Sequence, residues 1–514
     1  MESAAVPVTP EAPKRSSAPG EKGLKTGAIG YASNVVIAVA STAPAYSIAA
    51  TLGFITAIAG LGTHAPAIMI VSFIPILFVS LGYRWFNLHD PDAGTTFAWV
   101  TRAMGPQLGW INGWAIFLAD VIVMASLSVI AGKYTFLLVG ATSASTSTVD
   151  LIIAAVVWIV LMTWICWRGI ELSARIQQFL LTFEVAILGL FAIVALVKVY
   201  GGGAPATAIK PEFSWFNPFT LSWGVIADSV LLGIFVYWGW DSGVAVNEES
   251  ENPAEGPGRA AVVSTVLLLL IYVLVTTGAQ GIEGTHFLSA NQNDVLSPLG
   301  KVVFGGGILQ KLLIFSVLTS ASASTQTTIL PTARTTISMA SWGAIPKIFG
   351  STHSRFQTPD VSTIAMGVIS TIWTVGIVAF DPNQNVLGDS ITALGFSICF
   401  YYGFTGIACA VYYRRELFVN ARRFFLVGVV PALGGLLMFG VFYKAYVSYS
   451  KAGVNYSPPL DGFQVPIVIG VGGLLLGVFL MLVAWPFHRE YFSRRPETAD
   501  PEILEAHFAR KTQP

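Results

Sequence analysis

Four acidic residues stand inside long apolar stretches of the sequence, a setting in which carboxyl groups are rare and usually functional. They are Asp120, Glu184, Asp228 and Asp241. An acid at the centre of a membrane helix costs about 2.5–3.5 kcal/mol on insertion scales, and almost no basic residue occurs at comparable depth. A carboxyl group away from water favours its protonated form, so each acid can take up and release a proton. These residues indicate proton transfer, a cationic or zwitterionic amine ligand, or both.

The first apolar stretch is interrupted by small residues and a proline, Ala40-Ser41-Thr42-Ala43-Pro44. Pro44 removes a backbone donor and clashes with the preceding turn of a helix. A helix broken here frees N–H and C=O groups at membrane depth, where they must face protein, water or a ligand. The free N–H groups would begin a half-helix whose positive end suits a carboxylate. A simple proline kink is the alternative interpretation.

The sixth apolar stretch contains a similar interruption, Phe235-Val236-Tyr237-Trp238-Gly239-Trp240-Asp241-Ser242-Gly243. Its two glycines permit unwinding, and its aromatic side chains can line or close a pocket. Anchoring at the membrane interface is the alternative role for these aromatics, but the run lies well inside the stretch. Interrupted helices at matching positions of two repeated halves are the strongest sequence indication of a transporter binding site.

These residues must be positioned by helices that cross a membrane. Of the 514 residues, 54% are hydrophobic and only 11% are charged, whereas soluble domains carry about 25% charged residues. A span needs about 20 apolar residues. Twelve candidate spans satisfy this condition, near 29–54, 65–84, 106–138, 150–167, 177–199, 222–246, 259–282, 306–333, 361–380, 388–413, 423–446 and 464–486.

Basic residues are distributed unevenly between the two sides that these spans define. With a cytoplasmic N-terminus, 21 of the 28 Lys and Arg residues fall inside and 7 outside, which agrees with the positive-inside rule. We therefore expect a disordered cytoplasmic tail over 1–26, a transmembrane domain over 27–487 and a cytoplasmic C-terminal tail over 488–514. The first residues lack the apolar segment of a signal peptide, and the zero net charge does not suggest nucleic-acid binding.

Four stretches of the sequence resemble the amino acid–polyamine–organocation (APC) transporter superfamily, in its branch of amino acid permeases. They lie in the family's order and at its helices, and they cover most of the first nine spans. They are the break at Ala40–Pro44, the run from Asp92-Ala93-Gly94-Thr95 to Gly113-Trp114, the run from Gly239-Trp240-Asp241 through Asn247-Glu248-Glu249 to Arg259, and the run from Arg334 to Ile345-Pro346-Lys347.

The resemblance implies an all-α, LeuT-like fold of two inverted five-helix repeats plus two peripheral helices, with discontinuous first and sixth spans. It implies alternating access around a central site. The substrate carboxylate would meet amides at Ser41, Thr42 and Ala43. The substrate amine would meet carbonyls at Phe235, Val236 and Tyr237, with Trp238, Gly239, Trp240 and Asp241 beside the substrate or its gate.

Coupling residues follow from the same resemblance. Some proton-coupled relatives place a lysine near the position of Glu184, so this chain departs from that pattern and the lysine mechanism does not transfer. We expect Glu184, Asp241 and Asp120 as candidates for proton coupling. Ser324 and Thr325 of the eighth span are candidates for a sodium site, because hard cations prefer oxygen ligands. Their alternative is hydrogen bonding within and between helices.

Other classes of function fit the sequence less well. Its six histidines lie near span ends, in loops or in tails, and no catalytic constellation, metal-binding spacing or cofactor motif stands out. No charged ring or filter of a channel is visible. We therefore expect a plasma-membrane permease for amino acids, coupled to protons with sodium as the alternative ion. A polyamine or organic-amine transporter, or an amino acid exchanger of the same fold, is the alternative.

Overall fold

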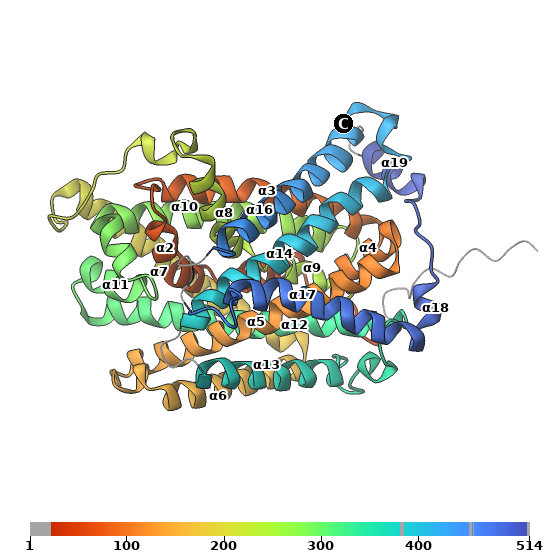
Figure 1. The fold of residues 1–514 in the computed structure, drawn as a ribbon, viewed down its shortest axis with the longest axis horizontal. Coiled ribbons are helices and arrows are strands. Elements are labelled where there is room, and N and C mark those ends of the chain that lie inside the picture. Colours follow the sequence, from red (N-terminus) through yellow and green to blue (C-terminus); the bar gives the residue numbers. More distant parts are fainter. Residues whose placement is uncertain (1–21, 381–384, 452–454, 456, 511–514) are drawn as a thin grey trace, which may run out of the picture.

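The computed structural model describes residues 22–380, 385–451, 455 and 457–510. In this part of the chain, twelve helical segments are long and apolar enough to cross a membrane, which confirms the predicted number (Figure 1). They are formed by α1 and α2 (Tyr31–Thr42 and Pro44–Ala57), α3 (Ala65–His89), α5 (Pro106–Leu138), α6 (Thr148–Arg168), α7 (Ile170–Gly201), α8 and α9 (Trp223–Tyr237 and Ser242–Ala245), α10 (Gly256–Ala290), α12 (Gly307–Ser341), α13 (Asp360–Phe380), α14 (Asn385–Tyr412), α15 and α16 (Ala421–Arg423 and Val430–Tyr449), and α17 (Val465–Ala484).

Shorter elements connect these spans. The α-helical ones are α4 (Thr96–Met104), α11 (Leu296–Phe304), α18 (Arg489–Phe492) and α19 (Pro501–Arg510). The single turns are η1 (Ala144–Thr146), η2 (Phe213–Phe216), η3 (Pro218–Thr220), η4 (Asn247–Glu249), η5 (Lys347–Gly350), η6 (Leu417–Val419), the π-helical η7 (Phe424–Val429) and η8 (Trp485–Phe487). The described residues form isolated bridges but no named strand.

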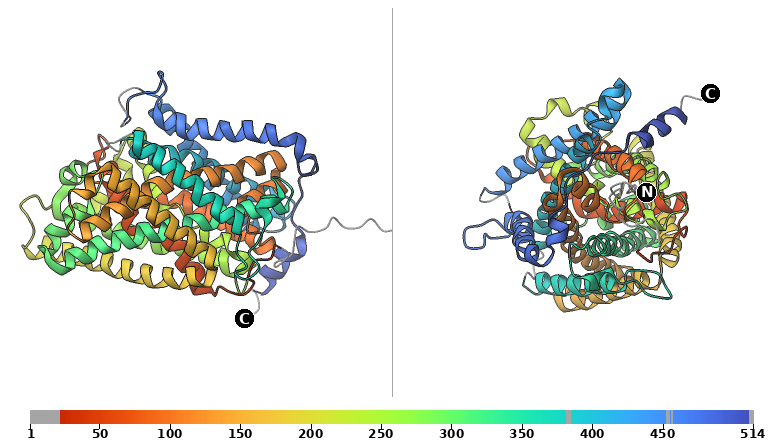
Figure 2. Two further views of the ribbon diagram at one scale, coloured as in Figure 1. Left: turned by 90° about the horizontal axis from the view of Figure 1, so that it is seen from below. Right: turned by 90° about the vertical axis from the view of Figure 1, so that its right-hand side faces the viewer.

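The spans divide into central and peripheral ones. The most apolar window of the first span, α1 with α2, is 89% buried, whereas that of the last span, α17, is only 22% buried. Seen along the bundle, the helices surround a central group, and α6 and α13 lie side by side at one margin (Figure 2). Apolar side chains on the peripheral helices therefore face outward, as contact with lipid requires. The two broken spans belong to the central group.

Glycines allow some of these helices to approach closely. A Cβ atom on Gly406 of α14 would lie 2.4 Å from the carbonyl oxygen of Pro431, and one on Gly435 of α16 would lie 2.4 Å from that of Gly403. Neither position tolerates a side chain. Small residues at such contacts let the backbones of membrane helices touch, and here they hold α14 against α16.

The two predicted tails differ in how much of them is described. Residues 1–21 of the N-terminal tail lie outside the described residues, whereas Lys22 and Leu24 near its end are buried. The predicted C-terminal tail contains α18 and α19. Tyr491 of α18 donates a hydrogen bond to the carbonyl of Pro106 at 2.9 Å, so this segment packs against the start of α5.

Candidate functional site

The break in the first span lies where the sequence indicated it. Helix α1 ends at Thr42, Ala43 adopts a left-handed conformation (φ 48°), and Pro44 begins α2. Proline is well suited to a first helical position because its missing N–H has no partner there in any case. Ala43 closes α1, since its N–H donates to the carbonyl of Ala40 at 3.1 Å. The chain therefore forms two helices rather than one kinked helix.

The backbone N–H groups that donate to side chains of other helices lie slightly later in the chain than the predicted Ser41, Thr42 and Ala43. The N–H of Ala45 donates to Oε1 of Glu184 at 2.7 Å, and that of Tyr46 donates to Oγ of Ser320 at 3.1 Å. By contrast, the N–H of Ala43 bonds within α1, and the carbonyl of Ser41 accepts from Ser324 at 2.8 Å. The first N–H group of α2 therefore belongs to Ala45, two residues after Ala43, and the substrate role of Ser41, Thr42 and Ala43 stays a prediction.

The break in the sixth span contacts the break in the first. Helix α8 ends at Tyr237, Trp238 is extended, and Gly239 has φ 115°. A Cβ atom on Gly239 would lie 2.8 Å from the carbonyl oxygen of Ser41. The hydroxyl groups of Ser41 and Ser242 are also hydrogen-bonded at 2.8 Å. Glycine is thus required at position 239 both by its backbone conformation and by the close approach of α1.

The other residues predicted around the sixth-span break are buried beside it. The carbonyl of Phe235 accepts from the N–H of Trp238 at 3.0 Å, and the rings of Phe235 and Tyr46 meet edge to face at 6.4 Å. Val236 is fully buried, and Tyr237 donates its hydroxyl to the carbonyl of Met69. The structure therefore brings the two predicted halves of the site together, although their contacts with a substrate stay a prediction.

Asp241 is surrounded by aromatic side chains, two of which donate hydrogen bonds to it. The hydroxyls of Tyr402 and Tyr401 on α14 lie 3.0 and 3.1 Å from its two carboxylate oxygens. Tyr401 also accepts a hydrogen bond from the indole of Trp238. The ring of Trp240 stacks on Tyr402 at 5.3 Å. A buried carboxylate held by hydroxyl donors can exist in the charged form without a cation beside it.

Sequence reasoning missed the tenth span as part of this site. Tyr401 and Tyr402 are adjacent in an otherwise apolar segment, and buried tyrosine hydroxyls normally find a polar partner. That pattern could have directed attention to them. The identity of the partner, Asp241, is a property of the packing of α14 against α8.

Glu184 on α7 faces the start of α2. Its side chain is fully buried, and Oε1 accepts from the N–H of Ala45 and from the hydroxyl of Ser320, both at 2.7 Å. Its second oxygen, Oε2, is buried without a hydrogen-bond partner among the described residues. No basic side chain of the described chain forms an ion pair with it. The carboxyl group is therefore held by an amide and a hydroxyl alone.

The remaining coupling candidates lie close to these groups. Asp120 on α5 accepts a hydrogen bond from the hydroxyl of Thr332 on α12 and lies near enough to Asp241 for the two carboxyl groups to interact electrostatically. Ser324 bonds across to the carbonyl of Ser41. Thr325 donates to the carbonyl of Ala321 in its own helix at 2.8 Å. Ser324 thus joins α12 to the break, whereas the hydroxyl of Thr325 serves its own helix.

One end of the bundle is closed by a buried cluster of charges around Lys22. The ammonium group of Lys22 lies 2.9 Å from Asp92 and 2.5 Å from Glu248, and Asp92 also accepts from the hydroxyl of Ser338 at 2.6 Å. Nearby, Arg334 forms two hydrogen bonds with the carboxylate of Glu249, at 2.5 and 2.9 Å. Three of the four stretches that carried the family resemblance therefore meet in this cluster.

The two acids that share Lys22 differ in acidity. Burial alone would raise the pKa of Asp92, but Lys22 and hydrogen bonds from Ser338 and the N–H of Gly94 lower it to about 2. Burial raises the pKa of Glu248 to about 7, against the attraction of Lys22. Burial alone would lower the pKa of Lys22, and the two carboxylates together raise it. At neutral pH the closed end is therefore held by a charged Lys22–Asp92 pair.

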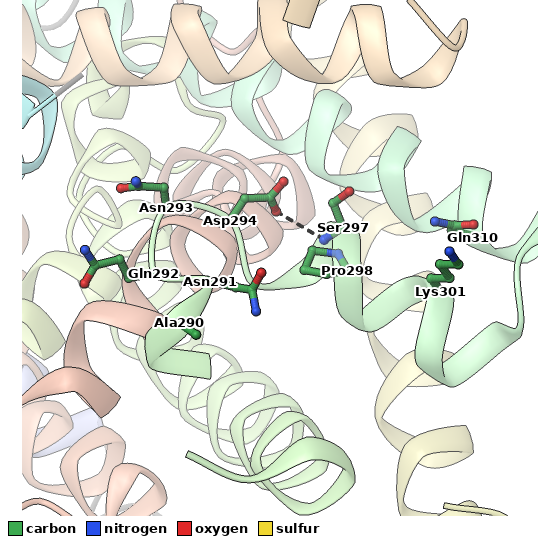
Figure 3. Close-up of a pocket in the computed structure, with 9 residues that line it drawn as sticks. All are labelled: Ala290, Asn291, Gln292, Asn293, Asp294, Ser297, Pro298, Lys301 and Gln310. Carbon is green, nitrogen blue, oxygen red and sulfur yellow. Dashed lines mark hydrogen bonds between the residues drawn. The ribbon is translucent and has the colours of Figure 1, made fainter. Parts of the chain in front are cut away.

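A polar hollow of about 520 Å³ lies at the opposite end of α12, between α10, α11 and α12 (Figure 3). Amide side chains of the α10–α11 connection line it, and Asp294 there accepts from the N–H of Ser297 at 3.1 Å. The next residue, Val295, donates its N–H to the carbonyl of Ala49 in α2 at 3.2 Å. The α10–α11 connection therefore contacts α2.

Comparisons with known proteins point to one family. A family model described as amino acid permease matches residues 29–463. A methylthioribose transporter of Bacillus subtilis is 24% identical over 411 residues, 77% of this chain and 83% of the relative. A branched-chain amino acid permease of Bacillus subtilis is 23% identical, covering 59% of this chain and 65% of the relative. A low-affinity putrescine importer of Escherichia coli is 21% identical, covering 60% and 66%.

Proposed function

Because the chain belongs to the amino acid permease family and is a multi-pass membrane transporter, we propose that it carries amino acids across the plasma membrane by alternating access, coupled to protons. The observation that supports this most is the direct contact between the two broken spans at Ser41, Gly239 and Ser242. Such breaks expose helix ends at membrane depth. Here they lie among three buried acids, Glu184, Asp120 and Asp241.

The charges around this contact support an amine-containing substrate. None of the ion pairs of the described residues involves Glu184, Asp120 or Asp241, so no fixed cation competes with a substrate ammonium group. The N-terminal end of α2 suits an anion, and in this structure its first two N–H groups donate to Glu184 and Ser320. A zwitterionic amino acid matches both features. Protons are the coupling ion that we propose, because the buried acids can take them up and release them.

An organic amine is the second candidate substrate, and one observation favours it. The N–H of Ala45 is already bonded to the carboxylate of Glu184, so a substrate without a carboxylate would leave this hydrogen bond intact. Two of the relatives above are described as transporters of putrescine and methylthioribose. Neither of these substrates is an amino acid.

Uptake by purified protein in liposomes tests the proposal. We expect a radiolabelled amino acid to enter faster under an inward proton gradient than without one. A panel of amino acids and amines, screened by thermal stabilisation, identifies the substrate first, because a ligand that binds the folded state raises the apparent melting temperature. Uptake that is unchanged when the proton gradient is collapsed but stimulated by sodium would contradict proton coupling. Stabilisation by amines alone would establish the second candidate.

A further inference from the structure

The amide end of α2 is occupied by a carboxylate that belongs to the protein. Oε1 of Glu184 accepts from the N–H of Ala45 at 2.7 Å, and Ser320 joins Glu184 to the next amide by accepting from Tyr46 and donating to the same oxygen. The first two N–H groups of α2 are thereby satisfied. A substrate carboxylate that seeks the end of this 14-residue helix meets an acid already in place.

The second carboxylate oxygen of Glu184, Oε2, also indicates that this side chain can exchange its hydrogen-bond partners. Glu184 is fully buried, and its Oε2 has no hydrogen-bond partner among the described residues. An unpartnered buried carboxylate oxygen is costly, and a proton on that oxygen or a donor group brought by a ligand would relieve the cost. Glu184 therefore does not behave as a fully satisfied structural residue.

The surroundings of Glu184 offer no other charge to balance a second carboxylate. Tyr272 on α10 lies near enough for an electrostatic interaction with Glu184, whereas Tyr46 on α2 donates its hydroxyl to Ser126. On α12, Lys311 and Arg334 lie 9 and 14 residues from Ser320, or roughly 13 and 21 Å along the helix. On α7, Arg175 and Lys198 are 9 and 14 residues from Glu184, or roughly 13 and 21 Å along the helix.

The charged residues of the other helices that pack against α7 also form no ion pair with Glu184 among the described residues. Helix α1 carries no charged residue, and α6 carries Asp150 and Arg168 only near its two ends. On α10, Arg259 and Glu283 are 13 and 11 residues from Tyr272, or roughly 20 and 17 Å along the helix. Lys301 of α11 is exposed. Two carboxylates that share one site cannot both stay ionised when no cation stands between them. An ionised Glu184 would therefore take up one proton when a second carboxylate arrives at the same amide.

We propose that Glu184 competes with the substrate carboxylate for the amide end of α2, so that binding of a carboxylate substrate is linked to uptake of one proton by Glu184. The proton comes from the aqueous side and stays on the Glu184 carboxyl group, while the N–H of Ala45 exchanges its acceptor from Glu184 to the substrate. An amine without a carboxylate requires no such exchange. This inference rests on the proposed function and specifies how its site links proton and substrate.

Calorimetric titration of the purified full-length protein tests the proposal. Binding heats measured in buffers of different ionisation enthalpy give the number of protons taken up for each substrate bound. The ligands are an amino acid that binds and the amine formed from it by removal of the carboxyl group, for example L-leucine and 3-methylbutylamine. We expect uptake of about one proton with the amino acid at the pH where its affinity falls most steeply, and about none with the amine.

Variants assign the proton to its residue. In Glu184→Gln, a neutral side chain of the same shape, proton uptake with the amino acid should fall to about zero. Its affinity should then stay constant over a pH range in which that of the parent weakens by up to about tenfold per pH unit. Asp228→Asn serves as the control and should behave as the parent, because Asp228 lies in the first half of α8, nine residues before the helix ends at Tyr237.

The outcomes separate the two proposals. Equal proton uptake in the parent and in Glu184→Gln, or equal uptake with the amino acid and with its amine, would overturn the competition while leaving an amino acid transporter. Binding of no amino acid at any pH would refute the proposed function itself. The comparison of amino acid with amine uses only the parent protein, so it remains decisive even if the variant fails to fold.

Discussion

Of Asp120, Glu184 and Asp241, only Asp241 accepts hydrogen bonds from two side chains among those that the structure describes. Its carboxylate oxygens accept from Tyr401 and Tyr402, and Trp240 packs beside it. A hydrogen bond to a charged group contributes about 1.5–3 kcal/mol, so the carboxylate fixes the aromatic side chains around the sixth-span break. Asp228 lacks such a setting, since its Oδ1 is buried without a partner among the described residues.

Replacing Asp241 by Asn should impair transport more than replacing Asp228 by Asn. Loss of the charge weakens the two tyrosine hydrogen bonds, and about 1.5–3 kcal/mol corresponds to a tenfold or greater reduction in initial uptake rate. Asp228→Asn should stay within about twofold of the parent. Uptake in liposomes at matched protein content provides the measurement, and equal rates for both variants and the parent would refute the role of Asp241.

At the scale of single residues, the sequence predicted which acids are exceptional but not which groups form hydrogen bonds with them. Apolar flanks mark Asp120, Glu184 and Asp241 as exceptional regardless of fold. The groups that donate hydrogen bonds to these acids are 136 to 212 residues away in the chain, as with Ser320 for Glu184 and Thr332 for Asp120. Such pairs depend on how helices pack, and that packing leaves no local pattern in a single sequence.

At the scale of elements, the breaks could be predicted and the N-terminal segment could not. Proline and glycine act locally, so Pro44 and Gly239 indicated where α1 and α8 end. The segment before α1 carries no comparable signal. In the structure Lys22 is buried against Asp92 and Glu248, and Ile29 pairs with Ser250. This segment therefore holds together the ends of elements that are distant in sequence.

Replacing Lys22 by Ala should release the N-terminal segment. Removing one partner of a buried ion pair costs about 3–5 kcal/mol because the remaining charges lose their compensation. Amide hydrogen exchange in residues 24–30, followed by mass spectrometry, should accelerate by at least about a hundredfold. Lys25→Ala is the matched control, because Lys25 and its partner Glu171 are 43% and 48% exposed and such pairs contribute about 1 kcal/mol or less. Similar exchange in the two variants would show that the Lys22 cluster does not hold the segment.

At the scale of the whole molecule, the uneven distribution of Lys and Arg residues distinguishes the same two ends of the bundle as the fold does. The end closed by Lys22 also contains η5 and the start of α13, whereas the opposite end contains the α10–α11 connection and the long loop before α8. Most Lys and Arg residues lie at the first end. Some of them, such as Lys22 and Arg334, are neutralised by buried acids. The exposed remainder still favours a cytoplasmic location for this end.

Cysteine labelling on intact cells tests this orientation. The three native cysteines, Cys166, Cys399 and Cys409, are all buried, so the parent should react little with a membrane-impermeant maleimide. Phe213 is 96% exposed in the loop before α8, and Ser354 is exposed in the loop before α13. The variant Phe213→Cys should be labelled from outside, whereas Ser354→Cys should be labelled only after the cells are permeabilised. The reverse pattern would place both termini outside, and the Lys22 cluster would then close the extracellular end of the transporter.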